Sequence, residues 1–140
     1  MWLAVKLLPW VDDKKIAAIG FCFGGLCVLD LARTGVAIKG VASFHGILSA
    51  PDNHPNAAIR AKVLALHGYD DPMATPQQLT EFQNEMTQYE ADWQVHSYGH
   101  TVHAFTNPIA DNPDAGMIYN GTADKRSWLA MQNFLTEIFA

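Results

Sequence analysis

The chain has few cysteines, little charge and no long apolar run. Its 140 residues include two cysteines, Cys22 and Cys27, and their spacing is not C-x-x-C. This number excludes a disulfide framework, and the spacing argues against a thioredoxin-type pair or a zinc knuckle. Because free thiols suit a reducing compartment, the sequence predicts a cytoplasmic protein.

Charge is also sparse. Charged residues make up 16% of the chain, and the formal net charge of -5 arises without a long run of either sign. Binding of nucleic acid requires clustered Lys and Arg, so no nucleic-acid partner is expected. No apolar run approaches the about 18–20 residues that cross a bilayer, so no membrane association is expected. Residues 1–10 resemble a signal peptide, but Lys6 interrupts them and no small-residue cleavage site follows; we interpret them as a packed amphipathic segment.

What the chain does have is apolar residues, at 49% of the total, in short runs. This is enough for the core of one domain covering residues 1–140. Buried strands are predicted at residues 15–20, 39–46, 61–68 and 92–99, and helices at 24–34, from Thr75 onward, and at 124–139. Residues 48–60 are predicted as a loop with room for one helical turn, and residues 100–123 as a loop.

Thr75 is predicted to cap its helix, with Pro76 at the first helical position and Gln78 completing a capping box. Two apolar helix faces follow from helical spacing. The residues expected to point inward are Leu79, Phe82, Met86 and Tyr89 in one helix, and Trp128, Met131, Leu135 and Ile138 in the last.

The alternation of strands and helices predicts an α/β fold with a parallel sheet and right-handed crossovers. Ligands of such sheets lie beyond the carboxyl ends of the strands. A thiol (Cys22), a carboxylate pair (Asp70 and Asp71) and two imidazoles (His100 and His103) each follow a predicted strand. These groups are therefore expected at one edge of the sheet.

The stretch GFCFGG, residues 20–25, matches the G-x-S-x-G nucleophile elbow with cysteine in place of serine. A turn this tight requires small neighbours, and it raises Cys22 at the N-terminus of the following helix, where negative charge is favoured. The backbone N–H of Phe23 is then a candidate oxyanion donor. The alternative is an ordinary strand–helix turn with an inert, buried thiol.

An imidazole and a carboxylate complete a possible nucleophilic site. His103 is placed to take the thiol proton, and one of Asp70 and Asp71 to orient it. The motif GYDDP also suits a simple polar turn, and His103 a hydrogen-bonded loop residue.

Three stretches, IAAIGFCFGG, LALHGYDDPM and VHAFTNP, together resemble the dienelactone hydrolase family of the α/β-hydrolases. The similarity runs from about residue 11 to the C-terminus, and the closing YNGTADKRSWLAMQNFL also fits. The resemblance implies Cys22 as nucleophile, Asp71 (the end of a G-x-x-D pattern) as the acid, and His103 as the base. It implies hydrolysis of a small lactone or activated ester through a thioester. No cofactor and no metal are expected.

One departure from the family bears on substrate. The best-known members hold a substrate carboxylate with arginines, one of them four residues after the histidine, and this position is Asn107 here. Dienelactone itself is therefore not the expected substrate, and the substrate-binding residues stay unassigned.

Other candidate residues have simpler interpretations. Cys27 is expected to pack in the core, and His45 and His67 to be hydrogen-bonded structural histidines near the site. A metal site formed by His100, His103 and Asp71 is a weak alternative, because no helical ligand motif supports it.

Family members are longer, with the elbow near the middle, so the resemblance implies that this chain matches their C-terminal part. The strand at residues 15–20 would then lie at a sheet edge, and an apolar edge strand favours pairing. We expect a homodimer or higher oligomer. Two hypotheses follow: a cysteine-dependent hydrolase, or a noncatalytic α/β protein that self-associates through this edge.

Overall fold

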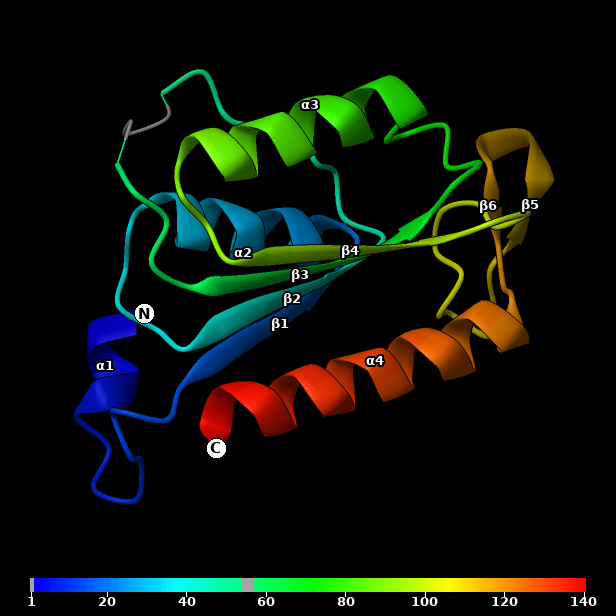
Figure 1. Ribbon diagram of the computed structural model, residues 1–140. Helices are drawn as coiled ribbons and strands as arrows, with labels where there is room; N and C mark the ends of the chain where they lie inside the picture. Colours follow the sequence, from blue (N-terminus) through cyan, green and yellow to red (C-terminus); the bar gives the residue numbers. More distant parts are fainter. Residues whose placement is uncertain (1, 54–56) are drawn as a thin grey trace.

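A four-stranded parallel sheet organises the computed structural model, which describes residues 2–53 and 57–140 (Figure 1). The strands are β1 (Ala17–Phe21), β2 (Gly40–Phe44), β3 (Lys62–Gly68) and β4 (Trp93–Tyr98), and they lie in the order β1-β2-β3-β4. All three strand pairs are parallel, which confirms the predicted fold class. The strand ends differ from the predicted ones by no more than two residues.

Helices cover both faces of the sheet (Figure 1). α2 (Phe23–Arg33) and α3 (Pro76–Gln88) lie on one face, and α4 (Gly121–Phe139) lies on the other. The two central strands are apolar on both sides for this reason: Val41 and Val63 pack toward α2 and α3, whereas Ala42 and Leu64 pack toward α4. A short helix, α1 (Trp2–Lys6), precedes the sheet.

The start of α3 is as predicted. Thr75 accepts a hydrogen bond from the Gln78 N–H, and the Gln78 side chain accepts one from the Thr75 N–H, so the capping box is complete. Leu79, Phe82 and Met86 are buried, and Tyr89 is half-buried against them.

Helix α4 begins at Gly121, three residues earlier than predicted. The Asn120 side chain caps it by accepting hydrogen bonds from the N–H groups of Thr122 and Ala123, a signal that the sequence interpretation overlooked. The prediction that Trp128 points inward holds only in part: its ring lies 6.4 Å from that of the buried Phe44, but the residue is 49% exposed. Phe134 takes a core position instead.

The loop predicted at residues 100–123 contains a small second sheet. β5 (Asp111–Asn112), a 3-10 turn (Pro113–Ala115) and β6 (Met117–Ile118) form an antiparallel pair. In the other predicted loop, residues 48–53 and 57–60 hold no helix or strand, and residues 54–56 lie outside the described residues.

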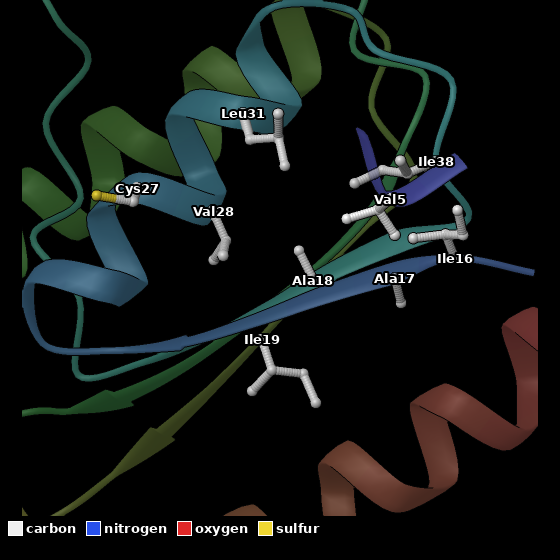
Figure 2. Close-up of a pocket in the computed structure, with 9 residues that line it drawn as sticks. All are labelled: Val5, Ile16, Ala17, Ala18, Ile19, Cys27, Val28, Leu31 and Ile38. Carbon is white, nitrogen blue, oxygen red and sulfur yellow. The ribbon is translucent and has the colours of Figure 1, made fainter. Parts of the chain in front are cut away.

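The strand β1 lies at an edge of the sheet, as predicted, with Ile19 41% and Phe21 43% exposed. Cys27 of α2 is exposed, so its assignment to the core was wrong: no element of the described chain stands beyond β1 to cover that side of α2. The interpretation of residues 1–10 as a packed segment holds only in part. Val5 lines a groove beside β1 (Figure 2), whereas Leu7 and Trp10 are 82% and 79% exposed.

Among residues 2–53 and 57–140, no helix combines the length and the apolar character that a bilayer crossing requires.

Candidate active site

The turn between β1 and α2 holds its central residue in an unusual backbone conformation. Cys22 has φ 53° and ψ -118°, a region that non-glycine residues rarely adopt. Gly20 permits the turn, because a Cβ at this position would collide with the Gly24 carbonyl. Gly25 is the second required glycine, since its Cβ would lie 2.7 Å from the Ser43 hydroxyl oxygen and 2.9 Å from the Gly46 Cα.

The turn therefore depends on Gly20 and Gly25, and not on Gly24 as the motif suggested. A Cβ on Gly24 would meet no atom within 4 Å. The strand–turn–helix geometry that the pattern G-x-C-x-G predicted is present, but one of its glycines was given the wrong physical role.

Cys22 sits exposed at the N-terminal end of α2. Its N–H donates to the Phe44 carbonyl (3.0 Å), which fixes the elbow to the end of β2, and its carbonyl accepts from the Leu26 N–H (3.2 Å) to open the helix. The first N–H groups of a helix have no intrahelical acceptor, so the Phe23 amide beside the thiol is available to an anion.

Asp71 lies at the end of the turn that follows β3 and is 2% exposed. One carboxylate oxygen, Oδ1, accepts a hydrogen bond from the Met73 N–H (2.8 Å), and the other, Oδ2, lies 2.8 Å from Nδ1 of His103. The adjacent Asp70 is exposed, and its N–H donates to the Thr101 carbonyl (3.0 Å). Asp70 therefore joins two loops through its backbone, while Asp71 directs its side chain to the site.

His103 is 1% exposed and lies between the acid and the thiol. Its backbone N–H donates to the Gly116 carbonyl (2.9 Å) and its carbonyl accepts from the Ile118 N–H (3.2 Å), so the small β5–β6 sheet holds it in place. Its Nε2 lies 3.1 Å from Sγ of Cys22.

The charge state of His103 follows from these neighbours. Burial by itself lowers the pKa of His103, but hydrogen bonds to Asp71 and Cys22 outweigh it and raise the pKa above the ordinary 6.5. With Nδ1–H donating to the carboxylate, Nε2 faces the sulfur and can accept its proton. The arrangement can therefore form a thiolate–imidazolium pair.

Two further histidines approach the site. His45 is 3% exposed and has φ 38°; its ring meets that of His103 edge-on, with centroids 5.1 Å apart. Its Nε2 lies 2.8 Å from the Thr106 hydroxyl, a contact that sequence reasoning missed. Burial, with the charge of His103, lowers the pKa of His45 to about 4.

The prediction of hydrogen-bonded structural histidines holds for one ring nitrogen of His45 and was wrong for His67. Within the described part of the chain, neither ring nitrogen of His67 has a partner, and Nδ1 of His45 has none. Burial lowers the pKa of His67, which favours its neutral form. His100 is exposed, and residues 2–53 and 57–140 contain no cluster of three or more His, Cys, Asp and Glu side chains able to hold a metal.

A family model described as "Dienelactone hydrolase family" matches residues 2–139. The chain belongs to the dienelactone hydrolase family. Among curated proteins, the Caenorhabditis elegans protein K02A2.1 is 38% identical over 140 residues, an alignment that covers 98% of this chain and 89% of that protein.

Two solved structures are similar to this chain. A dienelactone hydrolase-like promiscuous phosphotriesterase, P91, from metagenomic libraries is 40% identical with a TM-score of 0.90, covering 99% of this chain and 59% of that one. MGS-M1, an α/β-hydrolase from a Medee basin deep-sea metagenome, shares the fold with a TM-score of 0.68 at 18% identity, over 92% of this chain and 56% of that one. Three further curated relatives are matched over 44–55% of their length, so this chain spans about half of them.

Asn107 occupies the position at which the family resemblance implies an arginine. Its side-chain oxygen accepts a hydrogen bond from the Ile109 N–H (3.2 Å), and its own N–H donates to the Ala104 carbonyl (2.9 Å). The amide is thus engaged in its own loop, and it brings no positive charge to a substrate carboxylate.

Proposed function

We propose that the chain hydrolyses small, uncharged esters or lactones through Cys22, His103 and Asp71. The observation that carries this proposal is the position of the buried His103 ring, 2.8 Å from a carboxylate oxygen and 3.1 Å from the thiol sulfur. A structural histidine needs one of these contacts; a general base needs both, because one nitrogen must be oriented while the other accepts the proton.

The first half-reaction forms a thioester. His103 takes the thiol proton at Nε2 as Sγ of Cys22 attacks the substrate carbonyl carbon, and the carbonyl π electrons move to the oxygen. The Phe23 N–H stabilises this oxyanion. When the tetrahedral intermediate collapses, the C–O bond to the leaving group breaks, and the leaving oxygen receives the proton from His103.

The second half-reaction releases the acid. Water attacks the thioester carbonyl while His103 accepts one of its protons, and collapse breaks the C–S bond and returns the proton to the sulfur. Asp71 keeps Nδ1–H oriented and balances the imidazolium charge in both halves. A thiolate is a good leaving group, so the cycle favours substrates whose alcohol is also acidic, such as enol or aryl esters.

The competing hypothesis is a noncatalytic α/β protein that retains these side chains. Two observations favour this hypothesis. Cys22 is exposed, and in the part of the chain that the structure describes the Phe23 N–H is the one oxyanion donor that we assign. The two hypotheses share the thiolate–imidazolium pair and differ in turnover.

The test uses two readouts on the same variants. We expect p-nitrophenyl acetate turnover near neutral pH to be lost in Cys22→Ala and retained in Cys27→Ala, which is the matched control. Because P91 is described as a phosphotriesterase, a neutral aryl phosphotriester belongs in the same assay. Rapid alkylation of Cys22 that depends on His103, without turnover of either substrate, would support the noncatalytic hypothesis. Equal turnover in Cys22→Ala would contradict the hydrolase proposal.

A further inference from the structure

The ring of His45 is the point at which the loop that carries His103 meets the sheet. His45 directly follows β2 and is 3% exposed. Its Nε2 lies 2.8 Å from the Thr106 hydroxyl. The same ring meets those of His103 and Phe105 edge-on, with centroids 5.1 and 5.2 Å apart. One buried side chain therefore contacts both the proposed base and the loop residues that follow it.

The backbone on both sides of this contact is strained. His45 has φ 38° and Ala104, in the facing loop, has φ 56°; both lie in the left-handed region that residues other than glycine rarely adopt. Such conformations persist only where the surrounding structure enforces them, and they cluster at functional sites. The direction of the His45 side chain is therefore a feature that the fold imposes.

Contacts on each side of His45 enforce its conformation. Its N–H donates to the Leu66 carbonyl of β3 (2.9 Å), and the preceding Phe44 carbonyl accepts from the Cys22 N–H (3.0 Å). The following residue, Gly46, packs so closely on the backbone of α2 that a Cβ there would collide with it. The short segment that carries His45 is thus fixed to β3, to the elbow and to α2.

His103 needs such a support because its other partners do not fix the tilt of its ring. The β5–β6 sheet holds its backbone, and Asp71 Oδ2 lies 2.8 Å from its Nδ1. A hydrogen bond tolerates a range of angles, so the contact with Asp71 by itself leaves the ring free to tilt. A second ring packed edge-on against it removes this freedom, since edge-to-face pairs have a preferred geometry.

We propose that His45, anchored by Thr106, is a positioning residue for His103, and that it fixes the tilt of the imidazole so that Nε2 faces the sulfur of Cys22. The inference rests on the proposed thiol–imidazole pair, and it assigns to His45 and Thr106 an effect that reaches the thiol through His103. The Thr106 hydroxyl is essential to it, because without this anchor the His45 ring can turn away from the base.

The charge state of His45 suits this role. A positive charge on His45 would oppose the imidazolium form of His103, whose ring centroid is 5.1 Å away. Burial, and after it the charge of His103, lowers the pKa of His45 to about 4, and the charge of Asp71 offsets part of this effect. His45 is therefore neutral near pH 7. It supports the ring of His103 without opposing the charge that the base acquires.

The test is the rate of alkylation of Cys22 by iodoacetamide as a function of pH, measured in Cys27→Ala. Thr106→Val keeps the shape of the side chain but removes the hydroxyl, and it leaves Nε2 of His45 buried without its partner. We expect the rate near pH 7 to fall about tenfold and the profile to move to higher pH, because less thiolate forms beside a misplaced base. Thr106→Ser restores the hydroxyl and should restore the profile.

A second variant removes the other partner. His45→Phe keeps a ring but loses the bond to Thr106, and it should slow alkylation to a similar extent. The double variant, His45→Phe with Thr106→Val, should be no slower than either single one, since the two residues act as a unit. The matched controls are Thr136→Val in α4 and His96→Phe in β4, both at exposed positions, and they should leave the profile unchanged.

A purely structural role for His45 predicts a different result: lower urea unfolding midpoints with an unchanged alkylation profile of the folded protein. That result, or a loss in Thr106→Val that Thr106→Ser does not restore, would overturn the inference. The two Thr106 variants decide the matter if His45→Phe does not fold. Turnover of p-nitrophenyl acetate is measured separately. Its absence in wild type, with alkylation that depends on His103 and Thr106, contradicts hydrolysis and supports the inference, whereas alkylation independent of His103 overturns both.

Discussion

Replacing Asp71 by Asn tests whether the carboxylate does more than fill its turn. The Asn side-chain oxygen can still accept from the Met73 N–H, as Oδ1 does at 2.8 Å, so the local fold should persist. Its amide would then donate to Nδ1 of His103. This forces the ring proton onto Nε2, the nitrogen that faces the sulfur of Cys22 at 3.1 Å, so His103 no longer accepts the thiol proton.

The size of the effect follows from burial. The side chains of Asp71 and His103 are both almost fully buried, at 0% and 1% exposed. Removing one partner of a buried, hydrogen-bonded ion pair costs about 3–5 kcal/mol. At about 1.4 kcal/mol per tenfold change, the thiolate–imidazolium form should become about 10²–10⁴ times rarer.

The assay is the rate of alkylation of Cys22 by iodoacetamide, measured from about pH 5 to about pH 9, across the range in which thiols and imidazoles titrate. It is carried out in Cys27→Ala, because Cys27 is exposed and would react as well. Asp70→Asn is the matched control: the same change at the exposed neighbouring residue should leave the rate unchanged. Equal alkylation rates in the two Asn variants would refute the reasoning.

The remaining predictions concern stability. The pKa of His103 is raised above 6.5, so protonated His103 contributes fully to the free energy of unfolding below pH 6.5, and this contribution is lost as the pH rises through the raised pKa. We therefore expect urea unfolding midpoints to fall more steeply over this pH range in wild type than in His103→Gln. His45 should change the free energy of unfolding in the opposite direction, because its pKa is lowered to about 4 and the unfolded chain binds the proton at a higher pH than the folded chain does. Stability should therefore fall between pH 6.5 and 4, by up to about 3 kcal/mol. A His45→Phe variant with the same acid dependence as wild type would contradict this. Gly25→Ala should destabilise the fold by about 1–3 kcal/mol through overpacking, whereas Gly24→Ala should be neutral or stabilising; thermal melts giving the reverse order would show that the elbow is held differently.

Local patterns were sufficient for most of the architecture. The four strands could be predicted because each is a short apolar run bounded by turn residues. The start of α3 could be predicted because four consecutive residues form its capping box. The prediction for Cys27 was wrong because helical spacing tells which residues share a face, but what covers this face depends on the neighbouring element. In the part of the chain that the structure describes, no strand lies on the outer side of β1 to cover Cys27.

The candidate site, too, could be predicted only in part from the sequence. The sequence by itself determined that a thiol, a carboxylate and an imidazole follow parallel strands, because the motif glycines and the alternation of elements are local properties. The residues alone left Asp70 and Asp71 open, and the family resemblance selected Asp71; the tertiary structure supplies the physical reason, since adjacent residues in a turn point in different directions and only Asp71 reaches His103, 32 residues away. The tertiary structure by itself decided that His45 packs against His103, because this contact depends on distances between chain segments that no single stretch of sequence contains.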